Sequence, residues 1–155
     1  MQKKPVYNPF FLYWLIAGSV LILDQITKAL VREYVPMGAS KGWAHVAITH
    51  ATNTGVAFGF FQGTNWFFSL IATVVIVLLG VHAKKLSQEY WTAWALILGG
   101  ATGNLVDRLL FGAVTDFISI GWWPSFNVAD SVLVIGVLLL LWQMRKKNSN
   151  ENSYE

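Results

Sequence analysis

The sequence predicts an all-α membrane protein with four transmembrane helices, a small β-element on the extracytoplasmic side and both termini in the cytoplasm. Apolar residues make up 55% of the chain and charged residues 12%, whereas soluble domains average about 45–50% and about 25%. Four stretches approach the length of about 20 apolar residues that a spanning helix needs. Basic residues gather at one set of helix ends, which indicates the cytoplasmic side.

The first span is expected from about residue 10 to 31, and Pro9 suits the first position of a helix. The apolar run FLYWLIAGSVLIL continues past any plausible cleavage point, so it predicts an uncleaved span rather than a signal peptide. The second span is expected over about 65–82, with Thr64 or Asn65 as its cap.

The third and fourth spans are expected over about 90–110 and about 126–144. The fourth is close to the minimum length and carries Asp130 in its first turns. Residues 1–144 therefore form one integral-membrane domain, and the polar residues 145–155 are predicted to be a disordered cytoplasmic tail.

The connections between the spans differ in length. The outer loop, residues 32–64, is long and rich in glycine, and Val46, Ala47 and Ile48 favour short strands at the membrane surface. The connection from Phe111 to Ser125 is short, and its tryptophans favour the membrane interface.

The positions of lysine and arginine predict the orientation. One side of the membrane collects Lys3, Lys4, Lys84, Lys85, Arg145, Lys146 and Lys147. The opposite side carries Arg32, Lys41 and Arg108. The larger group indicates the cytoplasm, so the long loop faces outward.

Several kinds of function are excluded by composition. The formal charge is +3, but the basic residues flank apolar spans instead of forming a stripe, so no nucleic-acid partner is expected. The chain has no cysteine, which excludes thiol catalysis and disulfides. Its three histidines are scattered without metalloprotease spacing, and no nucleotide-binding loop is present. No metal or cofactor is expected.

Polar side chains occur in the spans at helical spacing. Asp24 and Lys28 are four residues apart and share a helix face. Asn104 shares a face with Asp107 and Arg108, as Asn127 does with Asp130. All of these lie in the outer half of the predicted bundle, which indicates one site open to the outer face.

Asp116 and Asp130 are the strongest candidates for chemistry. Carboxylates in a bilayer cost about 2.5–3.5 kcal/mol each at helix-centre depth, and two that share a proton can activate water. The alternative is that both flank or cap helix ends in interfacial water, and spacing leaves the two interpretations open.

The other polar groups also have structural alternatives. Asp24 and Lys28 favour a structural ion pair. Asp107 beside Arg108 suits either a local pair or substrate positioning, and Asn53 either a turn or a site.

Five ordered motifs carry a resemblance to a known family. DQITK at 24–28, NTGVAF at 53–58, GNLVDR at 103–108, VTDF at 114–117 and FNVADS at 126–131 resemble the motifs of signal peptidase II, the bacterial prolipoprotein signal peptidase. The four-span layout agrees across nearly the whole chain. One departure is Thr115, where the family often has valine.

The resemblance implies an aspartic endopeptidase that uses dyad-activated water to remove signal peptides, cutting before the diacylglyceryl-modified cysteine. Asp116 and Asp130 would be the catalytic dyad. The residues implied to bind substrate or shape the site are Asn53, Gly55, Asn104, Arg108 and Asn127. Asp24 and Lys28 would be structural supports, and we assign Asp107, a nearby acid, the same role.

The resemblance further implies a multi-pass protein of the bacterial cytoplasmic (inner) membrane, with its active site on the extracytoplasmic side. Similar proteins have a small β-element in the first outer loop and a short helix before the fourth span. The expected partners are prolipoprotein substrates and membrane lipid, and the expected state is a monomer.

The residues by themselves suggest three rival functions. Intramembrane carboxylates also serve proton-coupled carriers, but a carrier needs a midplane site and often internal repeats, which are not seen. A noncatalytic assembly subunit is the second rival. A serine–lysine hydrolase would need Lys28, which already has Asp24 as its expected partner.

Overall fold

The computed structural model describes residues 9–43, 45–55 and 63–151. Its helices are α1 (Pro9–Tyr34), α2 (Asn65–Val81), α3 (Trp91–Phe111) and α4 (Val128–Glu151), with short 3-10 helices at Ala83–Lys85 and Gln88–Tyr90. Its strands are β1 (Ser40–Trp43), β2 (Val46–Asn53), β3 (Val114–Ile120) and β4 (Trp123–Phe126). Lys3, Lys4, residues 56–58 of the NTGVAF motif and the last residues of the tail, 152–155, lie outside the described residues.

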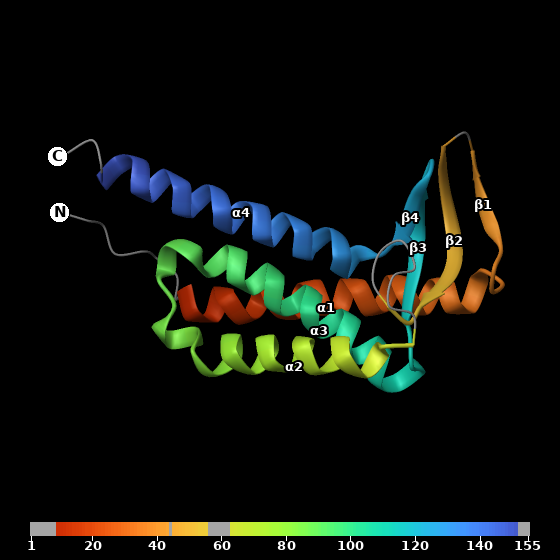
Figure 1. Ribbon diagram of the computed structural model, residues 1–155, viewed down its shortest axis with the longest axis horizontal. Coiled ribbons are helices and arrows are strands. Elements are labelled where there is room, and N and C mark those ends of the chain that lie inside the picture. Colours follow the sequence, from red (N-terminus) through yellow and green to blue (C-terminus); the bar gives the residue numbers. More distant parts are fainter. Residues whose placement is uncertain (1–8, 44, 56–62, 152–155) are drawn as a thin grey trace.

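The helices run back and forth along the long axis, and the sheet stands at one end (Figure 1). The C-terminal ends of α1 and α3 and the N-terminal ends of α2 and α4 all lie beside the sheet. Helix α3 packs against each of the other three helices. The polar motifs of α1, α3 and α4 therefore meet at the end of the bundle that carries the sheet.

Small residues on α3 allow the helices to approach closely. A side chain at Gly99 would place its Cβ 2.7 Å from the carbonyl oxygen of Ala17 on α1, and one at Gly103 would lie 2.5 Å from the carboxylate of Asp24. Glycine at these positions lets α3 approach α1 closely, because no Cβ lies between them. This close packing brings the polar side chains of α1 and α3 within hydrogen-bond distance.

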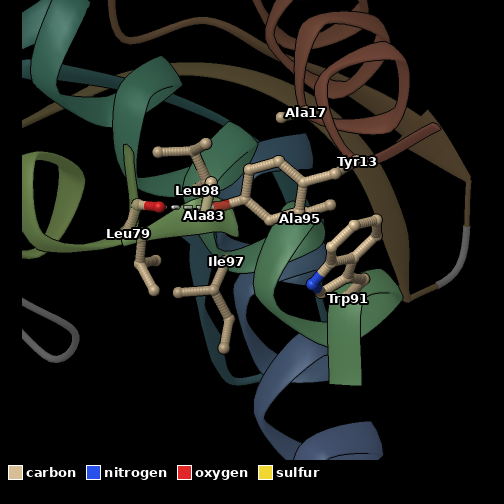
Figure 2. Close-up of a cluster of buried hydrophobic side chains, with 8 residues drawn as sticks. All are labelled: Tyr13, Ala17, Leu79, Ala83, Trp91, Ala95, Ile97 and Leu98. Atoms are coloured by element: carbon tan, nitrogen blue, oxygen red, sulfur yellow. Dashed lines mark hydrogen bonds between the residues drawn. The ribbon is translucent and has the colours of Figure 1, made fainter. Parts of the chain in front are cut away.

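An apolar cluster fills the opposite end of the bundle. It joins the start of α1, the end of α2 and the first half of α3 (Figure 2). Its members are Tyr13, Ala17, Leu79, Ala83, Trp91, Ala95, Ile97 and Leu98. The Tyr13 hydroxyl donates to the carbonyl of Leu79 at 3.3 Å. The segregation of apolar and polar groups agrees with the prediction of one polar site at one end.

The strands form one antiparallel sheet in the order β1-β2-β3-β4. The expected strands of the long loop are confirmed as β1 and β2. The expectations for residues 111–125 were wrong: neither a plain connection nor a short helix is present, because β3 and β4 form a second hairpin. Its β-branched Val114, Thr115 and Ile118 favour strand, and Gly121 turns the chain with a φ of 56°.

The helix positions agree closely with the predicted spans, with one exception. Helix α4 continues to Glu151, so residues 145–151 are helical where a disordered tail was expected. No glycine or proline interrupts this segment, and Arg145, Lys146 and Lys147 are good helix formers.

Length and composition identify two helices of the described chain as able to cross a membrane, Phe10–Tyr34 and Val128–Ser149. Helix α2 is apolar but short, at 17 residues. Helix α3 is continuous, but its apolar sequence is interrupted by Asn104, Asp107 and Arg108. The fold is thus mostly helical, with long apolar helices and a small four-stranded sheet.

Candidate functional site

Asp116 lies on β3 and is almost fully buried, at 3% exposure. Its Oδ1 accepts a hydrogen bond from the Asn127 side-chain amide at 2.7 Å. Its Oδ2 accepts one from the Asn53 amide at 3.1 Å. Asp116 therefore caps no helix, and two asparagine side chains determine the plane of its carboxyl group.

Asp130 lies in the first turn of α4. The Asn127 side-chain oxygen accepts the Asp130 backbone N–H at 2.9 Å, and Asp130 Oδ2 accepts the Asn127 backbone N–H at 3.2 Å. This reciprocal pair is a capping box, in which asparagine replaces the usual serine or threonine. The capping interpretation thus holds for Asp130, and the cap also orients its carboxyl group.

Asn104 and Asn127 join the two aspartates. The Asn104 amide donates to Asp130 Oδ1 at 2.7 Å, and its oxygen accepts the Asn127 amide at 3.2 Å. Asn127 is fully buried and contacts both Asp116 and Asp130. Residues from β3, α3 and α4 are thereby held in one hydrogen-bonded cluster.

Asn53 ends β2 and has two partners. Besides donating to Asp116, its side-chain oxygen accepts the backbone N–H of Gly55 at 3.0 Å. An asparagine that bonds the backbone two residues ahead makes an Asx-turn. Asn53 therefore both forms the turn and donates to Asp116, and Gly55 belongs to that turn.

The predicted pairing of Asp24 with Lys28 is confirmed at 2.9 Å, and both side chains are fully buried. Lys28 also donates to Asn104 Oδ1 at 3.0 Å. Asp24 Oδ1 accepts the backbone N–H of Ala129 at 2.9 Å, which satisfies one of the free N–H groups at the start of α4. The Asp24–Lys28 pair therefore links α1 to Asn104 on α3 and to Ala129 on α4.

Asp107 forms no ion pair with Arg108 in the described structure, so the local pair, one of the two interpretations that the sequence left open, is not observed. Asp107 instead forms ion pairs with Arg32 at 3.3 Å and with Lys28 at 3.7 Å, and it accepts the Thr115 backbone N–H at 2.8 Å. Neighbouring residues on a helix do not face each other, so Asp107 turns toward α1 and β3.

Arg108 turns toward the site cavity, where its guanidinium lies 5.9 Å from the ring centre of Phe68. Its buried Nε has no hydrogen-bond partner among the described residues. Arg108 therefore brings a positive charge to the lining of the cavity.

A cavity of about 610 Å³ opens over both aspartates. Its charged and amide-bearing lining residues are Asn53, Arg108, Asp116 and Asp130, and Ser125 and Ser131 add hydroxyl groups. Its apolar lining comes largely from β4 and α4. The apolar lining residues are Val114, Trp123, Pro124, Phe126, Leu133, Val134 and Ile135. A cavity of this size, apolar with a few convergent polar groups, is typical of a ligand site.

The environment of Asp116 favours its protonated form. Burial raises the pKa of Asp116 to about 7, and the nearby charge of Asp130 adds to the rise. Hydrogen bonds from Asn53 and Asn127 and the positive charge of Lys28 act in the opposite direction. An acid that titrates near neutral pH beside a second carboxyl suits acid–base chemistry.

Three residues of the site were not predicted. Gln25 donates to the carboxylates of Asp24 and Asp107, and Arg32 and Thr115 bond to each other at 3.0 Å. Arg32 follows Lys28 by four residues on the same helix face, so that spacing was an available signal. Nothing in the spacing of Thr115 indicates its partner.

Comparison with known proteins gives a consistent result. The family model described as signal peptidase (SPase) II matches residues 16–146. A lipoprotein signal peptidase of Syntrophomonas wolfei is 43% identical over 133 residues, which cover 83% of this chain and 89% of that protein. One of Pseudomonas paraeruginosa is 39% identical over 162 residues, covering 91% of this chain and 93% of that protein.

Two solved structures of bacterial membrane enzymes have a similar fold. The first has a TM-score of 0.82 and 35% identity, and the match covers 89% of this chain and 90% of that chain. The second has a TM-score of 0.78 and 34% identity, with 93% and 97% covered.

Proposed function

Because the chain belongs to the signal peptidase II family of aspartic peptidases, which removes signal peptides from prolipoproteins, we propose that Asp116 and Asp130 form its catalytic dyad. The proposed substrate is a diacylglyceryl-modified prolipoprotein, which the enzyme cuts immediately before the lipidated cysteine. The reaction needs no metal, cofactor or covalent intermediate.

The observation that carries this proposal is the arrangement around Asn127. One buried asparagine contacts both carboxyl groups, and both line the same cavity. Two carboxyl groups close together retain one proton between them, because both cannot ionise at low cost. Such a pair supplies a base for water and an acid for the carbonyl at the same place.

We assign the resting proton to Asp116, whose pKa is raised to about 7 by burial. Asp130 takes the ionised role, because it sits at the N-terminal end of α4, where backbone N–H groups stabilise negative charge. The Asp130 carboxylate removes a proton from water, and the water oxygen attacks the scissile carbonyl carbon. Asp116 simultaneously gives its proton to the carbonyl oxygen.

The second step reverses both proton positions. The tetrahedral hydroxyl returns its proton to Asp116 as the carbonyl re-forms, and Asp130 gives its proton to the departing amine nitrogen. Arg108, whose side chain lines the cavity, suits the stabilisation of the developing negative charge. The apolar wall of α4 suits the signal peptide or the acyl chains.

The same proposal includes the membrane arrangement: four spanning helices, cytoplasmic termini and a site facing outward across the bacterial cytoplasmic (inner) membrane. The short connection after α2 and the end of α4 lie opposite the sheet (Figure 1) and carry Lys84, Lys85 and Arg145. Positive charge favours the cytoplasmic side. The sheet exposes Trp43 and Trp122, and such side chains favour an interface. We propose that the working form is a monomer.

The function is tested with purified protein in detergent micelles and a synthetic signal-peptide segment whose cysteine carries a diacylglyceryl group. We expect mass spectrometry to detect cleavage immediately before that cysteine. The matched control is the same peptide with an unmodified cysteine, which should be cut at least about tenfold more slowly. Cleavage at another bond, or equal cleavage of both peptides, would contradict the proposed specificity.

The pH dependence follows from the proton on Asp116. Since the acid must be protonated, kcat/KM is expected to fall above about pH 7, approaching tenfold per pH unit. Replacing Asn53 with alanine removes a hydrogen bond that stabilises ionised Asp116, so its pKa should rise. The basic limb of the pH profile of kcat/KM should then move to higher pH.

The matched control is Thr49→Val, also on β2. It removes a hydrogen bond to Ser125 at 3.2 Å but contacts neither carboxylate. Its basic limb should coincide with that of the wild type. A limb that moves to lower pH in Asn53→Ala would assign the proton to a different group.

A further inference from the structure

We propose that Arg32 and Thr115, with Asp107, form a clamp that positions Asp116 for the reaction. The proposal rests on the catalytic role of Asp116 described above. It assigns a function to two side chains outside the catalytic cavity: Arg32 near the end of α1 and Thr115 on β3. We call Arg32, Asp107 and Thr115 the Arg32 clamp.

The Arg32 clamp holds β3 through both the side chain and the backbone N–H of Thr115. Arg32 Nη1 donates to Thr115 Oγ1 at 3.0 Å and to Asp107 Oδ1 at 3.3 Å. Asp107 Oδ2 accepts the backbone N–H of Thr115 at 2.8 Å. Thr115 is therefore fixed at two points, one from α1 and one from α3.

Burial and stacking limit the movement of the clamp. Thr115 is 2% exposed and Asp107 is fully buried. The Arg32 guanidinium lies 4.2 Å from the ring centre of Phe111, a cation–π contact that holds its plane.

The clamp acts on Asp116 through the strand. Consecutive residues of a strand point to opposite faces, so Thr115 is held from the side facing α1 and α3 while Asp116 faces the cavity. The ladder between β2 and β3 is regular at Thr115 and Asp116, which pair with Thr52 and Ala51, but its register shifts just beyond Asp116, between Ile48 and Ala51. The clamp supplies a second attachment beside that irregularity.

The consequence concerns the turnover step. Loss of the Thr115 hydroxyl would leave the Asp107 bond and the cavity lining in place, so substrate binding should persist. The position of Asp116 relative to Asp130 would become less well defined. Small displacements of catalytic groups have large effects on rate, so kcat should fall while KM does not change.

The test compares Thr115→Val with Thr115→Ser, using the lipidated peptide in micelles. Valine, which the family often has at this position, keeps the shape of threonine and removes the acceptor for Arg32, whereas serine keeps the hydroxyl; the clamp is therefore proposed for this chain, in which Arg32 donates to Thr115. We expect Thr115→Val to lose about tenfold in kcat with KM within about twofold, and Thr115→Ser to retain most of the wild-type kcat. Arg32→Met should lose kcat similarly, and the double variant Arg32→Met/Thr115→Val no more than either single variant.

A threonine elsewhere provides the off-site control. Thr102 on α3 donates only within its own helix, to the Leu98 carbonyl at 2.7 Å, so Thr102→Val should leave kcat unchanged. Melting temperatures of all variants separate a positioning effect from a loss of folded protein. A purely structural role would lower the melting temperature of Thr115→Val and leave kcat per folded molecule unchanged, which would overturn the clamp.

The wild-type protein in the same assay separates the two proposals. No cleavage of the lipidated peptide by the wild type would overturn the proposed function. Cleavage by the wild type with equal kcat in Thr115→Val would overturn the clamp alone. Equal losses in the serine and valine variants would also overturn it, because the hydroxyl would then not matter.

Discussion

Replacing either Asp116 or Asp130 with asparagine is expected to lower kcat for the lipidated peptide by at least about 10³-fold. Asparagine keeps the size of the side chain but neither accepts a proton from water nor donates one to a carbonyl oxygen. Neither remaining aspartate can perform both roles at once. The measurement is single-turnover cleavage with enzyme in excess, which detects very slow reactions.

The asparagine variants should remain folded. Burial raises the pKa of Asp116 to about 7, above the value of about 3.9 in unfolded chains. Between these values the folded protein binds more protons than the unfolded chain, so its free energy of unfolding falls as pH rises from about 4 to about 7. The Asp116→Asn variant does not lose free energy of unfolding in this way. Its melting temperature at pH 8 should therefore be at most a few degrees below that of the wild type.

An exposed acid provides the control for the chemical change itself. Glu33 on α1 is exposed to solvent, and Glu33→Gln should leave kcat within about twofold of the wild-type value. Appreciable multiple turnover by folded Asp116→Asn or Asp130→Asn would remove the dyad assignment, and the noncatalytic alternatives would have to be reconsidered.

Replacing Lys28 with methionine is expected to destabilise the protein by about 3–5 kcal/mol. Lys28 is fully buried, lies 2.9 Å from Asp24 and donates to Asn104 at 3.0 Å. Methionine has a similar length but no charge, so Asp24 would be left as a buried carboxylate without its cation. The yield of folded protein and its melting temperature in detergent measure the effect.

The matched control removes both members of the pair. In the double variant Asp24→Asn/Lys28→Met, no unpaired charge remains from this pair, and Asp107 keeps its contact with Arg32 at 3.3 Å. Its melting temperature should exceed that of Lys28→Met alone. A well-folded but inactive Lys28→Met variant would instead give Lys28 a direct role in the reaction.

Contacts within one helix were predictable from residue spacing. The interval of four residues placed Asp24 beside Lys28, and the structure has that ion pair. The interval of three residues placed Asn127 beside Asp130, and they form the capping box. Spacing also indicated that the polar groups gather at one end of the bundle, because the position of each polar residue within its apolar span can be counted along the sequence.

Contacts between separate elements were less predictable. A local pair of Asp107 with its neighbour Arg108 was one of two interpretations that the sequence left open, and Asp107 pairs with Arg32 instead. The hairpin of β3 and β4 was expected as a connection or a short helix. In each case the outcome depends on which segment lies alongside, and local preferences of a few tenths of a kcal/mol cannot decide that.

The sequence alone was sufficient for the family and the helices, and it singled out the two aspartates as candidates, because ordered motifs and helical periodicity are properties of the linear chain. Their arrangement required the packed structure. Asn127 joins Asp116 to Asp130, and Lys28 reaches Asn104, across elements whose separation depends on close packing at Gly103. Burial, which raises the pKa of Asp116, is likewise a property of the assembled fold, since it requires surrounding elements to exclude water from the carboxyl group.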